Sequence, residues 1–253
     1  MQSMDSGLYA AYTGLLARTQ ALDTAANNLA NAGTVGFRAQ RDYFCSVLAG
    51  IADETPASQV GDAVNDFGVL GGNLIDQGQG TVTATGNPLD LALNGPGFFA
   101  IQTNQGVQYT RDGGFTRSAT GVLQTMQGEP VLDANGQPIT IPTGAVSIAP
   151  DGSVSVTTAE GSAIAGKVGV FGFSADVALV ALGTNRFTAP DGVQPTAIDG
   201  VVEQGSLEGA NLDAVHGTMQ LILVQRQAEM MQKALSVFNN DFDKTAAEDL
   251  GRV

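Results

Sequence analysis

The chain has little of what most enzymes use for catalysis. Its 253 residues include one cysteine, Cys45, one histidine, His216, and no tryptophan. A single cysteine excludes an internal disulfide, and this residue set cannot supply the ligands of a structural zinc site. Neither residue belongs to a recognisable nucleophile motif, so we expect Cys45 to be apolar filler. The composition predicts a protein that is not an enzyme and that holds no cofactor or metal.

Basic residues are also scarce. The chain has 11 Lys and Arg against 25 Asp and Glu, a formal net charge of −14. Residues 51–210 contain 16 of the acids and four bases, a net charge of −12. Nucleic-acid binding depends on Lys and Arg that replace phosphate counterions. We therefore expect no nucleic-acid partner and an acidic, well-solvated middle segment.

Long hydrophobic runs are missing as well. No stretch of about 18 apolar residues occurs, and the chain does not open with a basic segment followed by an apolar one. The sequence thus predicts neither direct membrane insertion nor a cleaved Sec signal peptide.

Both ends of the chain carry apolar residues at alternating intervals of four and three, the pattern by which one helix packs on another. It predicts helices over residues 6–32 and 211–247, roughly 40 Å and 55 Å long at about 1.5 Å per residue. These stripes either cover the protein's own core or bind other chains. The first stripe contains Leu8, Tyr12, Leu15, Leu22 and Leu29, and the second contains Leu221, Val224, Ala228, Met231, Leu235, Phe238 and Phe242.

Three asparagines, Asn27, Asn28 and Asn31, lie near the end of the first predicted helix. We expect Gly33 to end that helix in the left-handed conformation. The asparagine side chains either cap the fraying helix end or bind a neighbouring chain through their amides.

The middle of the chain has a different period. Leu89, Leu91 and Leu93 alternate with Asp90 and Ala92, which is typical of half-buried strands. Turn dipeptides such as those at 135–136 and 151–152 separate similar runs. We predict an α+β protein with four segments: an N-terminal helix at 1–35, an extended connector at 36–80, an antiparallel β domain of barrel or sandwich type at 81–208, and a C-terminal helix at 209–253.

Two other patterns could in principle form a catalytic or a metal-binding site. Asp90 and Asp112 could form the carboxylate pair of a glycosidase, but both lie where Asp usually holds a turn or faces water. Residues 71–76 loosely resemble one calcium-binding nonapeptide repeat, and a single repeat does not make a site. We favour structural roles for both.

Five sequence blocks closely resemble the bacterial flagellar rod and hook family. They follow in the family's order and are spread from residue 27 to residue 212, which makes the resemblance specific. The blocks are NNLANAGTVGF (27–37), TGNPLDLALNGPGFF (85–99), YTRDGGF (109–115), GEPVL (128–132) and QGSLEGANL (204–212).

The resemblance implies an axial component of the flagellum that leaves the cytoplasm through the flagellar export apparatus without signal cleavage. It would polymerise in the periplasm with copies of itself and neighbouring rod proteins. Its terminal helices would form a coiled-coil-like tube around the export channel, as a drive shaft that transmits torque. The assembly contacts would be the two stripes, the three asparagines and Phe37.

Chain length favours a rod protein over a hook protein, which would normally carry a further outer domain. Within the rod, residues 34–40 resemble the proximal-rod protein more than the distal-rod protein, in which Lys more often follows Phe37. A distal-rod or hook-junction subunit is the alternative. More remote alternatives are a secreted binder of cell-wall glycan or an enzyme acting on it, and a soluble coiled-coil adaptor with a β head.

Overall fold

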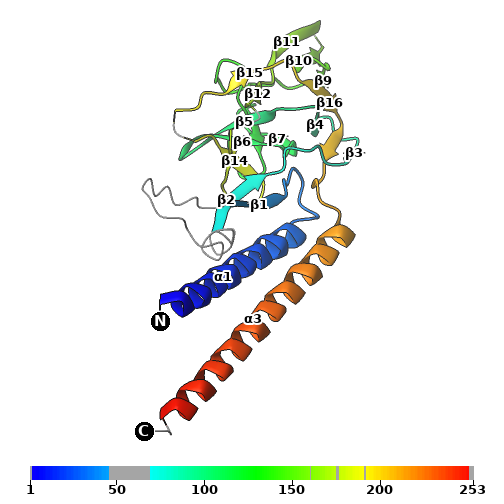
Figure 1. Cartoon of the computed structure of the whole chain (residues 1–253). Helices are drawn as coiled ribbons and strands as arrows, with labels where there is room; N and C mark the ends of the chain where they lie inside the picture. Colours follow the sequence, from blue (N-terminus) through cyan, green and yellow to red (C-terminus); the bar gives the residue numbers. More distant parts are fainter. Residues whose placement is uncertain (1, 46–68, 160, 175–176, 191, 251–253) are drawn as a thin grey trace. The chain divides into compact units, whose positions relative to one another are not determined.

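The computed structural model describes residues 2–45, 69–159, 161–174, 177–190 and 192–250. It contains two long helices and an antiparallel β region between them in sequence (Figure 1). The chain divides into two compact units. The helical unit comprises Met1–Leu29, Gln40–Asn73 and Val215–Val253, and the β unit comprises Ala30–Ala39 and Leu74–Ala214. The predicted α+β class with a central antiparallel β domain is confirmed.

The two helices lie within four residues of their predicted bounds. Helix α1 is Gln2–Ala30 and helix α3 is Ala214–Leu250. Asp213 directly precedes α3, in the position that favours a short polar side chain as cap.

The expectation that Gly33 ends the first helix in the left-handed conformation is wrong. The helix ends at Ala30, and a turn follows in which the Thr34 amide donates to the Asn31 carbonyl at 2.9 Å. Any residue can adopt this turn. The left-handed glycine of this segment is Gly36, with a φ of 69°.

The segment expected to be an extended connector contains two strands. Strand β1, Gln40–Cys45, and strand β2, Val69–Ile75, form a two-stranded sheet. Residues 46–68 lie outside the described part of the chain. Sequence patterns missed β2 because it contains Gly71 and Gly72, which have low strand propensity.

The β unit consists of several small antiparallel sheets rather than one continuous sheet. The largest has the order β13-β14-β6-β5-β12-β15, and a three-stranded sheet has the order β11-β10-β9. Two-stranded ladders pair β16 with β4, β17 with β3 and β7 with β8. The strands are β3 Val82–Ala84, β4 Leu91–Asn94, β5 Phe98–Thr103, β6 Gly106–Thr110, β7 Phe115–Arg117, β8 Leu123–Thr125, β9 Ala145–Ile148, β10 Ser153–Thr158, β11 Gly161–Lys167, β12 Val170–Gly172, β13 Val180–Ala181, β14 Arg186–Thr188, β15 Thr196–Ala197, β16 Val201–Gln204 and β17 Ser206–Glu208.

Strand β5 runs through the centre of the β unit and is buried on both faces. Phe98 and Ala100 belong to one hydrophobic cluster, and Phe99 and Ile101 belong to another. Successive side chains of a strand point to opposite faces, so β5 separates the two clusters. The larger cluster contains Leu91, Leu93, Phe99, Ile101, Phe115, Leu123, Val131, Ile139, Ile141, Ile148, Val154, Val156, Val168, Val170 and Val202.

Strand β4 is more enclosed than its alternating pattern predicts. Leu91 and Leu93 lie in the larger cluster, but Ala92 between them is also fully buried. The reason is that β4 pairs with β16 and also contacts β17. Neighbouring strands therefore cover Ala92, which the alternating pattern predicted to face solvent.

Replacing a side chain of this core should destabilise the protein, whereas the same change on an exposed strand should not. Ile141 is fully buried, while Ile164 on β11 is 79% exposed. We expect Ile141→Ala to lower the free energy of unfolding by about 2–5 kcal/mol, from lost burial and the cavity that remains. The matched control Ile164→Ala should change it by less than about 0.5 kcal/mol. Urea denaturation of the full chain measures both changes. Equal losses in the free energy of unfolding would contradict the placement of Ile141 in the core.

Candidate functional site

A buried carboxylate joins four separate segments of the β unit. Glu208, the last residue of β17, is fully buried. Its Oε1 accepts hydrogen bonds from Arg38 Nη2 and from the Gly80 amide, both at 2.7 Å. Its Oε2 accepts one from Arg111 Nη1 at 2.9 Å. Three donors therefore compensate the loss of solvent around this carboxylate.

The two arginines also bind backbone carbonyls. Arg38 Nη1 donates to the Gly78 carbonyl at 2.7 Å, and Arg111 Nη2 donates to the Gly95 carbonyl at 2.6 Å. The Arg111 guanidinium carbon lies 5.4 Å from the ring centroid of Phe98. This position places the cation against the electron-rich π system of the aromatic side chain.

The cluster contains two cations and one anion, which affects proton binding. Burial lowers the pKa of Arg111 to about 10; the charge of Glu208 raises it, and that of Arg38 lowers it further. Arg111 therefore stays charged at neutral pH. Among the described residues, the Nε atoms of Arg38 and Arg111 have no hydrogen-bond partner although both are buried. The excess positive charge is balanced by the carbonyl dipoles and the Phe98 ring.

Backbone contacts complete this junction. The Glu208 carbonyl accepts from the Gly36 amide at 2.8 Å. The Asn211 side chain accepts from the Ala39 amide at 2.7 Å and donates to the Asp76 carbonyl at 2.9 Å. The segment that enters the β unit and the segment that leaves it are thus tied to each other.

Two glycines allow the chain segments to approach closely. A Cβ atom built on Gly36 would lie 2.3 Å from the Asp112 amide nitrogen, and one on Gly113 would lie 1.7 Å from the Leu91 carbonyl oxygen. Neither distance permits a side chain. The glycines in these blocks serve backbone contact, and no phosphate-binding loop is needed to explain them.

Asp112 and Asp90, the two carboxylates considered for catalysis, each hold a loop. Asp112 accepts from the Gly114 amide at 3.0 Å and from the Asn185 side chain at 2.9 Å. Burial raises the pKa of Asp112, while these two hydrogen bonds act to lower it. Asp90 accepts from the Asn87 side chain at 2.8 Å. The contacts support structural roles for both residues.

The predicted stripe of α1 lies opposite the face of α1 that is buried in the chain. The buried face consists of small and polar residues, Ala17, Ala21, Thr24, Ala25 and Asn28. At about 100° per residue the stripe lies on the other side of the helix. Tyr12 is 50% exposed, and Leu15, Leu22 and Leu29 are half-buried. The side chain of Leu8 lies outside the described residues.

Asn28 and Phe37 are engaged within the chain. The Asn28 side chain donates to the Gln40 carbonyl at 2.7 Å and accepts from the Gln40 amide at 2.9 Å. Phe37 is fully enclosed in the β unit. Of the other two asparagines, Asn27 is exposed and Asn31 is half-buried. The two Asn28 hydrogen bonds join α1 to the start of β1 within the chain, which differs from the helix-end capping considered for the asparagines.

The predicted stripe of α3 coincides with its more buried face. Leu235 is buried, and Leu221, Val224 and Met231 are half-buried. A Cβ atom at Gly14 of α1 would lie 3.4 Å from the terminal methyl of Met231, so the two helices meet there. The side chains of Phe238 and Phe242 lie outside the described residues.

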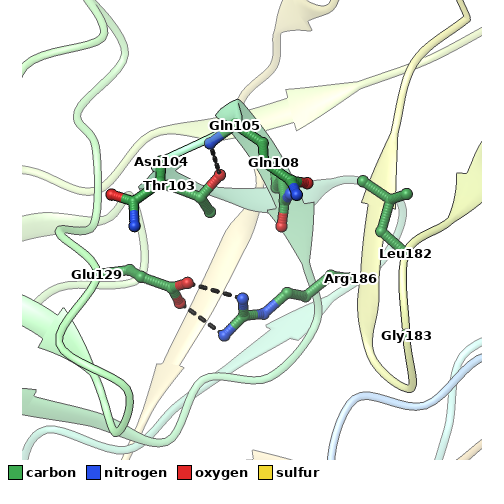
Figure 2. A pocket seen from close by; sticks show the side chains of 8 residues that line it. All are labelled: Thr103, Asn104, Gln105, Gln108, Glu129, Leu182, Gly183 and Arg186. Carbon is green, nitrogen blue, oxygen red and sulfur yellow. Dashed lines mark hydrogen bonds and ion pairs between the residues drawn. The ribbon is translucent and has the colours of Figure 1, made fainter.

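A polar pocket of about 410 Å³ lies elsewhere in the β unit (Figure 2). Its two charged side chains, Glu129 and Arg186, face each other and form an ion pair with Nη2 and Oε2 2.6 Å apart. No aromatic side chain lines this pocket, so it lacks the stacking platform that a sugar-binding site commonly uses. Its lining residues are Thr103, Asn104, Gln105, Gln108, Glu129, Leu182, Gly183 and Arg186.

Within the described part of the chain, no group of three or more His, Cys, Asp or Glu side chains is placed to bind a metal ion. None of the described helices has the length and apolarity required to cross a membrane.

Comparison with known proteins identifies the family. Two protein-family models match the chain. The family described as flagella basal body rod protein matches residues 8–38, and the family described as flagellar hook protein FlgE/F/G D1 domain matches residues 92–156. The flagellar basal-body rod protein FlgF of Caulobacter vibrioides is 34% identical over 253 residues, covering 99% of this chain and 100% of that protein. The chain belongs to the flagellar basal-body rod protein family.

Other relatives have similar names. FlgF of Rhizobium meliloti is 34% identical and covers 98% of this chain and 99% of its own length. FlgG of Bacillus subtilis is also 34% identical, covering 90% of this chain and 93% of its own. The resemblance stated from the five sequence blocks is confirmed, and the family is one of structural flagellar proteins.

Four of the five family blocks meet around Glu208. Gly36, in the first block, donates to the Glu208 carbonyl, and Arg38 directly follows that block. Gly95 lies in the second block, Arg111 in the third and Glu208 in the last. No sequence pattern predicted that these charged residues form a site. A usable signal was present, because Arg111 is one of only four bases in residues 51–210 and lies inside a block.

Removing the charge of Glu208 should destabilise the rod protein strongly. Glu208→Gln leaves two buried arginine cations without their anion, and we expect a loss of about 3–5 kcal/mol in the free energy of unfolding. The control Glu203→Gln changes an exposed carboxylate that contacts the Ser206 hydroxyl. It should cost less than about 0.5 kcal/mol. Urea denaturation measures the free energy of unfolding of both variants. Equal free energies for Glu208→Gln and Glu203→Gln would contradict a stabilising role of the cluster.

Gly36 and Gly33 offer a matched pair within one block. Gly36→Ala must strain a positive φ and push the Asp112 backbone away, whereas a Cβ at Gly33 meets nothing within 4 Å. We expect Gly36→Ala to destabilise the protein by at least about 1–3 kcal/mol. Gly33→Ala should have an effect near zero. Thermal unfolding distinguishes them, and a Gly36→Ala variant as stable as Gly33→Ala would contradict the close approach.

Proposed function

We propose that this chain polymerises through its terminal helices into the flagellar rod. The rod transmits torque and encloses the export channel. The observation that carries the proposal is the match to rod proteins over almost the full chain, together with apolar helix surface that the chain leaves exposed. Each Leu or Phe removed from water on assembly contributes about 1.5–3 kcal/mol.

The export route and location follow from the same proposal. The chain passes through the flagellar export apparatus without signal cleavage and assembles in the periplasm, with copies of itself and other rod proteins as partners. Within the rod we propose the proximal position, supported by Arg following Phe37. The alternative position is the distal rod.

Truncation tests polymerisation through α3. Deleting residues 218–253 removes most of the helix, so we expect a host lacking its own copy of the gene to remain non-motile when it expresses the truncated chain. The control is the full chain with Ile164→Ala, which alters an exposed side chain of the β unit and should restore swimming. Normal rods built from the truncated chain would contradict the proposal.

The position within the rod has its own readout in the same host. Electron cryotomography of cells without the gene should show basal bodies arrested before the distal rod is present. Rods that lack only their distal part would indicate the alternative position.

A further inference from the structure

The polar pocket of the β unit contains a buried hydrogen-bond acceptor without a partner. Gln108 lies on β6, lines the pocket and is only 6% exposed. Within the part of the chain that the structure describes, its Oε1 atom is buried and accepts no hydrogen bond. A buried polar atom without a partner costs free energy in the folded protein. A donor that reaches this oxygen would therefore remove an existing penalty when it binds.

The strand register places Gln108 and Arg186 on the same face of the six-stranded sheet. Phe187 on β14 pairs with Tyr109 on β6, and both side chains belong to the smaller hydrophobic cluster. Successive side chains of a strand alternate between faces, so Gln108 and Arg186 point to the other face. There Ile101 of β5, which pairs with Gln108, belongs to the larger cluster, to which β6 and β14 contribute no residue. The pocket thus lies over sheet that this core leaves uncovered (Figure 2).

The charges of the pocket disfavour an ionic ligand. Its cation, Arg186, binds the Glu129 carboxylate through both terminal nitrogens, with Nη1 2.7 Å from Oε1 and Nη2 2.6 Å from Oε2. The Thr125 hydroxyl also donates to Glu129, at 3.0 Å. An anion would compete with Glu129 for Arg186, and a cation would be repelled by Arg186 and meet a carboxylate that already has donors. The balance of charge favours an uncharged ligand.

The other lining groups suit an amide next to an aliphatic group. Asn104 and Gln105 are exposed at the pocket and, like Gln108, carry carboxamides, which can both donate and accept. A secondary amide could donate to Gln108 and accept from either of the other two. Leu182 at the pocket is 36% exposed, and Val180, two residues earlier, is 50% exposed. Amides that alternate with aliphatic groups are what a polypeptide presents.

We propose that this pocket binds an uncharged peptide amide of a partner protein, whose N–H donates to Gln108 Oε1. The site lies within the β unit, and the proposal does not depend on the rod function. The volume of about 410 Å³ accommodates a segment of about two residues. An acetamido sugar carries the same amide group, but no aromatic side chain lines the pocket to contact its ring.

Titration of the isotopically labelled full chain, followed by NMR, tests the ligand class with three matched probes. N-acetylglycine N-methylamide is uncharged, N-acetylglycine is an anion and glycine N-methylamide is a cation. We expect the uncharged probe to shift the Gln108 side-chain amide signals with a Kd of about 10 mM, which is usual for so small a ligand. The charged probes should bind at least about tenfold more weakly. Equal binding of all three, or shifts that leave Gln108 unaffected, would overturn the proposal.

N-acetylglucosamine, added in a parallel titration, separates the two sources of an amide. We expect it to bind more weakly than N-acetylglycine N-methylamide. Tighter binding of the sugar at Gln108 would overturn the assignment to a peptide.

A pair of glutamine variants tests the named acceptor. Gln108→Leu removes the oxygen with little change in side-chain volume, and we expect binding of the uncharged probe to weaken at least about tenfold. The matched control is Gln102→Leu on β5, an exposed position that points to the opposite face of the sheet. It should bind as the unmodified chain does. Unchanged affinity in Gln108→Leu would overturn the proposal, and if this variant does not fold, the probe preference of the unmodified chain decides.

Discussion

The β unit depends on one buried carboxylate. Glu208 binds Arg38 and Arg111 and also accepts the Gly80 amide, so segments that are far apart in sequence share a single anion. An apolar core could stabilise the strands alone, but it would not fix where the chain enters and leaves them. Because burying two arginines without an anion is costly, these segments are stable only together.

This constraint gives the family blocks a physical meaning. Their glycines permit backbones to touch, and Asn211 ties the outgoing segment to the incoming one. Arg111 and Glu208, which lie within blocks, form the cluster with Arg38, which directly follows one. The helices differ, because they keep apolar surface exposed in the single chain. The β unit therefore has its core covered within the chain, whereas each helix leaves part of its apolar surface exposed.

Sequence patterns predicted the helices, the antiparallel middle and the family. Periodicity succeeded where one face of an element is covered, as on α3, and misjudged β4, whose Ala92 is enclosed by strands distant in sequence. It placed the left-handed glycine at 33 instead of Gly36, because only the fold brings Asp112 close. The ion cluster was missed for the same reason: Arg38 and Glu208 are 170 residues apart.

Amide hydrogen exchange of the unmodified full chain, followed by NMR, tests the role of Glu208 most directly. The Gly80 amide donates to the Glu208 carboxylate, and the Gly36 amide donates to the Glu208 backbone carbonyl. The Leu91 amide donates to the Gly113 carbonyl in the core of the same unit. If the carboxylate closes the β unit, all three amides should exchange only through the same large opening and give the same free energy. Exchange at Gly36 and Gly80 many times faster than at Leu91 would contradict the account, because the segments around Glu208 would then open while the core stays folded.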